Sequence, residues 1–367
     1  MTASVPRGGG LDGNYRLTLI SDSDEVWGAE LFLATLAAAL PEEVMVSVIA
    51  PAVVRDRIEK GRKLVRRGRY VKSVKALRAQ LRGQVPDVVL VNATHPRSCR
   101  RALVAARSLG IPTVVIDHSP YQVLTSSGKV AQRLISRTAA RRLAVGSATA
   151  SALERSIGLE PGAIGVVLNG TPECAACPPR VRDGQVVLGT LGRLSQEKGL
   201  PTLLAAMPAL PSRYVLRIAG SGPDSKALAS AVQAAGLADR VDFVGYCSDV
   251  RGFLCDIDVF VQPSYSEGLP LTIVEAMFCG RPVIASDVGS ISDIIDQGVT
   301  GWLVPPQEPQ ALADALLLVG DDPALAATVA RDARSLATRE LSDQRMATRY
   351  DQIFRSVLGD VAAVVSP

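Results

Sequence analysis

The sequence predicts an α/β protein made of two doubly wound domains, each built on a parallel sheet. Short runs rich in β-branched residues alternate with helix-like stretches along the 367-residue chain. Continuous apolar strands between helices are typical of parallel sheets that are covered on both faces. The length favours two domains over a single core. The strand pattern also stops and restarts once, after residue 180.

Each predicted strand is an apolar run that ends at polar or glycine residues. The first half holds six such runs: RLTLIS (16–21), VMVSVIA (44–50), DVVLVNAT (87–94), TVVIDHS (113–119), LAVGS (143–147) and IGVVLN (164–169). The second half holds five: QVVLGTLG (185–192), YVLRIAG (214–220), VDFVG (241–245), VFVQPS (259–264) and PVIASD (282–287). Between them, NGTPECAACPPRVRDGQ has no hydrophobic period and is typical of a linker.

These signals give the following domain prediction. A flexible leader covers 1–13, an N-terminal domain covers 14–170 and a linker covers 171–185. A C-terminal domain then covers 186–341, and a helix capped by Ser342 covers 342–358. Whether this helix packs back on the first domain is open. Ligands of such sheets bind beyond the carboxyl ends of the strands, so we expect the two domains to face a shared cleft.

Cysteine content and hydropathy argue for a cytoplasmic protein. The longest apolar runs, such as LFLATLAAAL (31–40), are about half the length of a membrane span, and the leader lacks the apolar core of a signal peptide. Six cysteines do not suggest a disulfide scaffold. We expect CAAC (174–177) to be a reduced loop, with a zinc or redox role as the alternative.

The net charge of +4 comes from one stretch, 55–82, which holds twelve Lys and Arg against two acids. We predict a helix there with apolar residues along one side: Ile58, Leu64, Val65, Val71, Val74, Leu77 and Leu81. The stretch is either a solvated helix or a surface that binds anionic lipid at the inner face of a membrane. Nucleic acid is not expected, because no aromatic residues or base-reading motif accompany the charge.

Two glutamates eight residues apart mark the first candidate site, within SYSEGLPLTIVEAMFCGRPVIASDVG (264–289). Glu267 lies in a turn between a strand and a helix, and Glu275 lies inside that helix. The turn supplies backbone N–H groups for an anion, from Gly268, Leu269, Leu271 and Thr272 around Pro270. The carboxylates would accept hydroxyls of a sugar and of a ribose. The alternative is an acid at a helix N-terminus and an ordinary surface glutamate.

A second stretch, LGTLGRLSQEKGL (188–200), places two cations at a strand end. Arg193 and Lys198 lie on a loop where the sheet rule puts a ligand, and two cations there can neutralise a diphosphate. Lys198 could equally be a solvated lysine at the start of a helix. The chain has two histidines, His95 and His118, and both follow predicted strands.

GRLSQEKG, followed by PSYSEGLPLTIVEAMFCGRPVIASDVG and GWLVPP, resembles the family 4 retaining glycosyltransferases of the GT-B fold. The resemblance is specific over 188–315 and looser over 14–180. It implies that Arg193 and Lys198 hold the donor pyrophosphate and Glu275 the ribose hydroxyls. Glu267 would contact the transferred sugar, and His118 would face the reacting centre. The nucleobase is expected near Gly220, Gly222 and Tyr246.

The sequence departs from the family pattern in the loop after the first strand. This loop reads EVWGAE, so Trp27 replaces the first of two glycines. Gly28 can still approach the donor phosphates. Trp27, His95 and His118 are therefore acceptor-side candidates. No cofactor and no catalytic metal are expected, because SDSD (21–24) only superficially matches a metal-binding motif and lies away from the predicted phosphate clamp.

The predicted function is transfer of a sugar from a nucleotide diphosphate sugar to an acceptor hydroxyl, with retention and without a metal. The product could be a cell-surface glycan, a glycolipid or a natural-product glycoside. A sugar-nucleotide epimerase, a glycosyl phosphorylase and a non-catalytic sugar-nucleotide-binding subunit are the alternatives. A dinucleotide dehydrogenase is disfavoured, because no GxGxxG opens the first strand–helix unit. The base, the sugar and the acceptor stay open.

Overall fold

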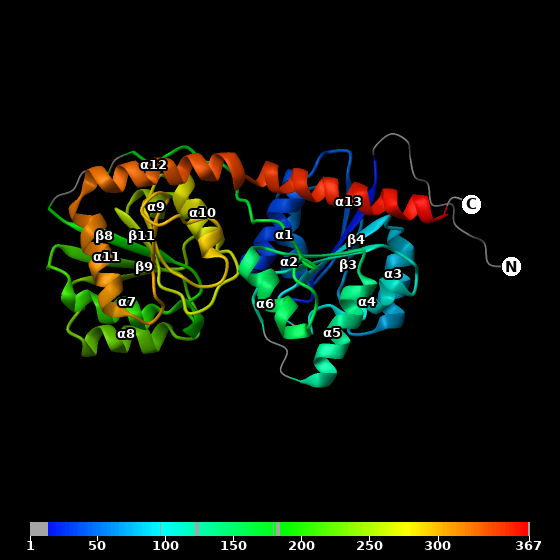
Figure 1. Cartoon of the computed structure of the whole chain (residues 1–367), viewed down its shortest axis with the longest axis horizontal. Coiled ribbons are helices and arrows are strands. Elements are labelled where there is room, and N and C mark those ends of the chain that lie inside the picture. The colour runs from blue at the N-terminus through cyan, green and yellow to red at the C-terminus, as the bar shows by residue number, and fades with distance from the viewer. Residues whose placement is uncertain (1–13, 96, 122–124, 179, 181–183, 366–367) are drawn as a thin grey trace. The chain divides into compact units, whose positions relative to one another are not determined.

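The computed structural model describes residues 14–95, 97–121, 125–178, 180 and 184–365, with side chains to residue 359. The predicted leader lies outside these residues. Contacts divide the chain into two compact units (Figure 1). The first unit contains the chain up to Gly170 and again from Asp343 onward. The second unit contains the residues from Thr171 to Ser342.

The first unit is built on a parallel sheet with the strand order β3-β2-β1-β4-β5-β6-β7. Its strands are β1 (Arg16–Ile20), β2 (Met45–Ile49), β3 (Arg67–Gly68), β4 (Val88–Ala93), β5 (Thr113–Asp117), β6 (Arg141–Ala144) and β7 (Gly165–Val166). Its helices are α1 (Gly28–Ala39), α2 (Ala52–Glu59), α3 (Val74–Gln84), α4 (Arg100–Arg107), α5 (Ser126–Thr138), α6 (Ser147–Ile157) and α13 (Asp343–Val365).

Burial explains why the central strands read as unbroken apolar runs. β1 pairs in parallel with β2 and β4, and Leu17, Leu19 and Ile20 of β1 are fully buried. Such a strand is covered on both faces, so it shows no alternation of polar and apolar residues. The predicted strand 164–169 is shorter in the structure, where only Gly165 and Val166 pair with β6.

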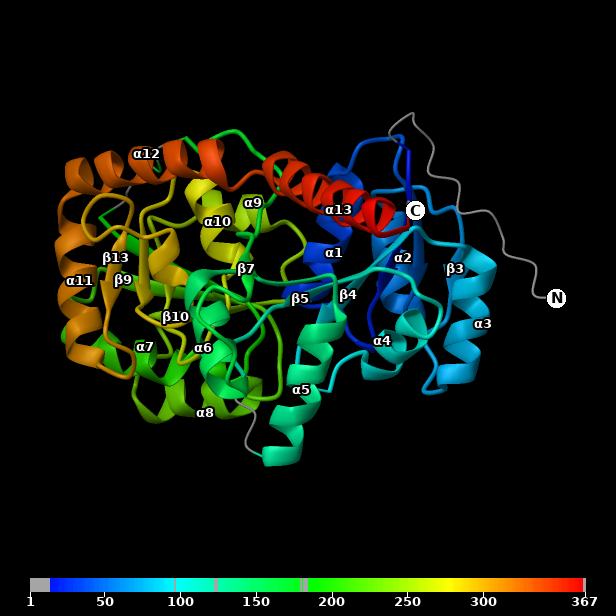
Figure 2. The same cartoon turned by 45° about the vertical axis from the view of Figure 1, so that its right-hand side comes forward.

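The C-terminal helix α13 packs on α1 within the first unit, side by side in Figures 1 and 2. Tyr350 and Phe354 of α13 are fully buried. The ring of Tyr350 lies 5.5 Å from that of Phe32 on α1, and the ring of Phe354 lies 6.0 Å from that of Tyr15. The chain therefore returns to complete the core of the unit in which it started.

The second unit has a parallel sheet with the order β10-β9-β8-β11-β12-β13. Its strands are β8 (Val186–Leu191), β9 (Tyr214–Ala219), β10 (Val241–Gly245), β11 (Val259–Gln262), β12 (Val283–Ser286) and β13 (Trp302–Val304). Its α-helices are α7 (Leu200–Ala206), α8 (Ser225–Ala234), α9 (Val250–Cys255), α10 (Leu271–Phe278), α11 (Pro309–Asp321) and α12 (Pro323–Glu340). Short 3-10 turns are η1 (Gln196–Lys198), η2 (Met207–Ala209) and η3 (Ile291–Asp293).

The prediction of one basic helix over 55–82 is wrong. The stretch contains the end of α2, the short strand β3 and most of α3. Pairing decides this: β3 adds to the sheet edge through Val48↔Arg67 and Ile49↔Gly68. A Cβ at Gly68 would lie 2.3 Å from an atom of Gln80 on α3, so glycine permits this close packing.

Most apolar residues of this stretch face the core of the first unit. Ile58, Leu64, Leu77 and Leu81 are buried, whereas Val65 is 57% exposed. Val71 and Val74 pack against the buried cluster beneath α3 and α4. No helix in the described residues is long and apolar enough to cross a membrane.

The expectation of a reduced CAAC loop is also wrong, because Cys177 forms a disulfide with Cys255. The two residues are 78 positions apart, so motif spacing gave no signal for the pairing. Residues 172–178 form neither helix nor strand. They are held to the second unit by side chains, including Arg334, which donates to the carbonyl of Cys174 at 2.9 Å.

Candidate functional site

The loops of the second unit that carry the predicted site follow neighbouring strands at a topological switch. The chain proceeds from β8 to β9 and β10 on one side, and then crosses to β11 on the other side of β8. The loops after β8 and β11 therefore lie next to each other at the carboxyl edge of the sheet. In open α/β sheets this is the place where ligands bind.

Lys198 and Glu267, one from each loop, are in direct contact. The Lys198 ammonium lies 2.7 Å from Oε1 of Glu267, and the two side chains are 24% and 9% exposed. The same oxygen accepts hydrogen bonds from Gln262 at 2.8 Å and from Ser264 at 2.7 Å. Arg193, Lys198 and Gln262 also line one small cavity of about 10 Å³. The two predicted cations thus share one place in the fold.

Glycines allow these loops to approach each other. Gly199 has φ +62°, and a Cβ there would lie 1.9 Å from the carbonyl oxygen of Pro263. Gly289 has φ +59°, and its Cβ would lie 1.9 Å from the carbonyl oxygen of Glu267. The backbone N–H of Tyr265 also donates to the backbone carbonyl of Glu197 at 2.8 Å. A larger residue at Gly199 would push the loops after β8 and β11 apart, and one at Gly289 would push the loop after β12 away from the loop after β11.

Glu275 lies on the second turn of α10 and is only partly accessible. Burial raises the pKa of its carboxyl to about 7. Among the described residues its carboxylate has no hydrogen-bond or ion-pair partner. A half-buried carboxylate without a partner is costly, and hydroxyl donors from a ligand would offset that cost.

The predicted nucleobase side joins the same edge through the loops after β9 and β10. The N–H of Gly220 donates to the carbonyl of Gly245 at 2.7 Å, and Leu194 donates to Ser221 at 2.9 Å. A Cβ at Gly222 would lie 2.2 Å from the carbonyl oxygen of Leu194. Tyr246 is 79% exposed at the end of β10. Its ring is therefore accessible to a ligand.

His118 directly follows β5 in the first unit and belongs to a polar network. Its Nε2 lies 2.6 Å from Oδ1 of Asn92. The amide of Asn92 donates to the carbonyl of Ala29 and to Glu30, each at 3.3 Å, so its Oδ1 is the atom that faces the ring. Nε2 of His118 therefore carries the proton. Burial lowers the pKa of His118 to about 3, so the ring is neutral and its Nδ1 is an acceptor.

The other acceptor-side candidates are less organised. The indole of Trp27 donates to Glu25 at 2.6 Å, directly before α1. His95 is exposed, and its Nδ1 accepts the N–H of Arg97 at 3.0 Å. A Cβ at Gly28 would meet nothing within 4 Å. None of the described residues of the first unit therefore requires glycine at that position.

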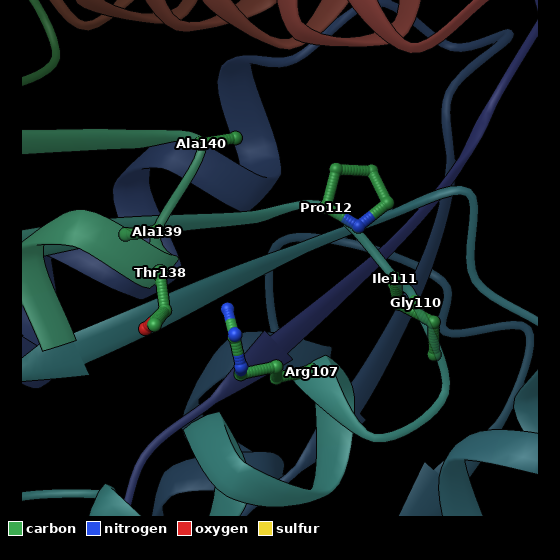
Figure 3. A pocket seen from close by; sticks show the side chains of 7 residues that line it. All are labelled: Arg107, Gly110, Ile111, Pro112, Thr138, Ala139 and Ala140. Carbon is green, nitrogen blue, oxygen red and sulfur yellow. The ribbon is translucent and has the colours of Figure 1, made fainter. Parts of the chain in front are cut away.

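An open pocket lies at the amino ends of strands in the first sheet, on the side away from His118. Arg107 and Thr138 line it, together with residues that precede β5 and β6 (Figure 3). These are the amino ends of parallel strands, where sheets of this type do not bind their ligands. Among the described residues, no group of three or more His, Cys, Asp and Glu side chains could hold a metal ion.

Two family models match the chain. A model described as Glycosyltransferase Family 4 matches residues 26–173, and one described as Glycosyl transferases group 1 matches residues 185–322. Together these ranges cover more than three quarters of the sequence. The chain belongs to the family 4 glycosyltransferases. Its two parallel-sheet α/β units are those of the GT-B fold.

Relatives of this family 4 glycosyltransferase are named for different sugar transfers. It is 30% identical over 249 residues to a 2-deoxystreptamine glucosyltransferase of Streptomyces kanamyceticus, covering 60% of the chain and 64% of that protein. It is 31% identical over 185 residues to a lipopolysaccharide core mannosyltransferase of Rhizobium leguminosarum, covering 48% and 53%. The matched segments thus span about half to two thirds of these relatives.

Solved structures support the fold of the family 4 glycosyltransferase over nearly its whole length. An Anabaena protein, HepE, crystallised with UDP, has a TM-score of 0.80 at 22% identity, covering 93% of this chain and all of that one. A sucrose-phosphate synthase from Thermosynechococcus elongatus has a TM-score of 0.78 at 22% identity, covering 95% and 100%. At such identities the likeness concerns the fold.

Three polar residues near the candidate sites of the glycosyltransferase were not predicted from its sequence. Gln262 and Ser264 bond to Glu267, and Asn92 fixes the ring of His118. All three are neutral residues at or just beyond strand ends, in VFVQPS and VLVNAT. The signal was their position, because the carboxyl ends of parallel strands converge on one edge.

Proposed function

We propose that the chain transfers a sugar from a nucleoside diphosphate sugar to an acceptor hydroxyl, with retention at the anomeric carbon. The contact between Lys198 and Glu267 at the switch point carries this proposal. It brings a cation for a phosphate and a carboxylate for a sugar hydroxyl to one place. An ordinary ion pair on the protein surface would not lie beside a second cation and a helix N-terminus, as this pair lies beside Arg193 and the start of α10.

The roles follow from charge and position. Arg193 and Lys198 neutralise the diphosphate, and the first-turn N–H groups of α10 add partial positive charge. The carboxylate of Glu275 accepts hydrogen bonds from the ribose hydroxyls, which supply the partners that it lacks among the described residues. As the bond between the anomeric carbon and the β-phosphate oxygen breaks, the acceptor oxygen bonds to that carbon from the same face. The acceptor proton passes to the departing phosphate, so no protein nucleophile is needed.

Charge on the departing phosphate is balanced by Arg193, Lys198 and the helix start, so the proposed reaction needs no metal ion. Neutral His118 contributes a lone pair at Nδ1, which can accept a sugar hydroxyl. UDP-sugars are the first donors to test, because HepE was crystallised with UDP and with UDP-glucose. The named acceptors of the relatives differ, so the acceptor is left to experiment.

The test combines donor screening with two variants. UDP-, GDP-, ADP- and TDP-sugars are screened by thermal shift, and products with candidate acceptors are identified by mass spectrometry and NMR. We expect an α-linked product from an α-linked donor, formed equally well in EDTA. Arg193→Ala or Lys198→Ala should each lower kcat/KM by about 10²-fold or more, which corresponds to roughly 3 kcal/mol. Lys226→Ala, at an exposed lysine of α8, is the control.

Other outcomes identify the alternatives. An altered sugar nucleotide formed without acceptor would indicate an epimerase, and a requirement for inorganic phosphate would indicate a phosphorylase. Donor binding with neither transfer nor slow hydrolysis would indicate a non-catalytic subunit. Near-wild-type turnover in either Arg193→Ala or Lys198→Ala would contradict the assigned roles.

We further propose that the enzyme works in the cytoplasm and touches anionic membrane through the basic stretch 55–82. Eight of its twelve basic side chains are exposed: Lys60, Lys63, Arg66, Arg67, Arg69, Lys72, Lys75 and Arg82. The apolar residues between them are mainly buried, so the attraction would be electrostatic and would not include insertion into the bilayer. Each basic residue near such a surface contributes about 1 kcal/mol.

A further inference from the structure

Four cysteines of the second unit lie in two contacting pairs around residues 174–177. Cys177 is disulfide bonded to Cys255, the last residue of α9. The sulfur atoms of Cys174 and Cys279 are 3.5 Å apart. Cys279 directly follows α10. One short segment thus contacts the C-terminal ends of both α9 and α10.

Hydrogen bonds from the backbone and from the Arg281 side chain hold this segment independently of its sulfur atoms. The N–H of Cys177 donates to the carbonyl of Cys279 at 2.9 Å. The guanidinium of Arg281 donates to the carbonyl of Pro178 at 3.0 Å and to that of Cys255 at 3.3 Å. Because these hydrogen bonds hold Cys177 and Pro178 against the ends of α9 and α10, the fold itself keeps Cys174 and Cys279 in contact.

The two thiols of the second pair differ in access. Cys174 is half-buried, whereas Cys279 is 1% exposed. Burial, together with the hydrogen bond to Cys174, raises the pKa of Cys279 to about 12, and Arg251 and Arg281 oppose this shift. An external reagent therefore meets Cys174 first, and Cys279 is placed to react with it afterwards.

We propose that Cys174 and Cys279 form a second, reversible disulfide by exchange with a low-molecular-weight disulfide such as oxidised glutathione. The Cys174 thiolate attacks one sulfur of the small disulfide, which gives a mixed disulfide and releases one small thiol. Cys279 then attacks the Cys174 sulfur, and its proton passes to the departing sulfur, which leaves as the second small thiol. Two protein thiols lose two electrons, and one small disulfide gains them.

The second disulfide would fix the C-terminal end of α10, the helix that begins at the candidate donor site. α10 begins directly after the turn Glu267–Pro270 and carries Glu275. The N–H of Cys279 donates to the carbonyl of Glu275 at 3.0 Å. Bonding Cys279 to Cys174 would therefore link α10 to α9 through residues 174–177. This link concerns bonding and stability, and it does not depend on the proposed transferase activity.

Disulfide mapping of the full chain tests the proposal. The protein is equilibrated in glutathione buffers from fully reduced to fully oxidised, quenched with N-ethylmaleimide and cut after glutamate. Cys174 and Cys177 then share the peptide 174–197, Cys255 lies in 198–267 and Cys279 lies in 276–308. We expect the first two peptides joined in mildly reducing buffer and all three joined in oxidising buffer.

Matched variants decide the outcome. Cys174→Ser, at a half-buried loop residue, should lose the three-peptide species and keep the two-peptide species. Cys247→Ser, at a half-buried thiol of the same unit, should keep both. Oxidation should raise Tm by about 3 °C or more in the parent and not in Cys174→Ser. Free Cys279 in glutathione disulfide alone, or a lasting mixed disulfide at Cys174, would overturn the proposal.

Discussion

At the scale of single residues, Glu275 combines a stability cost with a proposed binding role. Its carboxyl has no partner among the described residues, and burial raises its pKa to about 7 from 4.5. The folded state thus binds the proton more tightly than the unfolded chain does. The contribution of Glu275 to stability therefore falls as the pH rises from about 4.5 to above 7.

We predict that Glu275→Gln stabilises the second unit in a pH-dependent way. The free energy of unfolding should rise at pH 8 by on the order of 2 kcal/mol more than it does at pH 5, because only the ionised carboxylate bears the desolvation cost. Urea unfolding at both pH values measures this. The same variant should bind the nucleoside diphosphate more weakly.

Glu308→Gln is the control for this pH dependence. Glu308 is an exposed carboxylate of the same unit, so its replacement should change stability little at either pH. An equal gain at pH 5 and pH 8 in Glu275→Gln would show that the carboxyl is not desolvated. Unchanged nucleotide affinity would remove Glu275 from the proposed ribose site.

Charged residues of the candidate site could be predicted from sequence, but their neutral partners could not. Arg193, Lys198 and Glu267 lie in glycine-containing turns after strands, and the rule for strand ends brings such turns together. Gln262 and Ser264 carry no distinctive chemistry until the fold directs both at Glu267. The Cys177–Cys255 bond likewise depends on a contact across 78 residues.

At the scale of elements, the basic stretch shows how sheet pairing overrides a helical pattern. β3 pairs with β2, and Arg62 donates to the carbonyls of Leu40 and Pro41, each at 2.7 Å. Arg62 is therefore a structural residue of the loop between α2 and β3. In the described part of the chain the exposed lysine and arginine side chains around it do not bond to the backbone in this way; Arg67 is paired with Glu59, and the others contribute positive charge to the surface.

We predict that this surface binds anionic vesicles and releases them in salt. The triple variant Lys63→Glu, Arg66→Glu, Lys72→Glu should weaken binding by about 10²-fold or more, since three charges near the surface contribute about 3 kcal/mol. Co-sedimentation with phosphatidylserine-containing and neutral vesicles measures it. Lys129→Glu, Arg137→Glu, Lys226→Glu, at exposed positions elsewhere, controls for net charge. Equal loss in both triples would show that no local surface is involved.

At the scale of the whole molecule, the two units are separately cored, and chain order alone does not assign the last helix. The restart of the strand pattern after residue 180 gave the second sheet. The docking of α13 depends on rings that are distant in sequence, such as Phe354 near Tyr15 and Tyr350 near Phe32. Aromatic residues at helical spacing indicate a buried face, but they do not indicate which surface covers it.

We predict that the two units respond separately to a core mutation and to ligand. Phe354→Ala should destabilise the first unit by about 3–5 kcal/mol, because Phe354 is fully buried between α13 and Tyr15. UDP at 100 times its Kd should stabilise the second unit by about 2.7 kcal/mol. At roughly 2–4 °C per kcal/mol, calorimetry should show the two shifts on different transitions. Gln352→Ala, at an exposed site of α13, is the matched control. If Phe354→Ala and UDP shifted one and the same transition, the two units would have to unfold together.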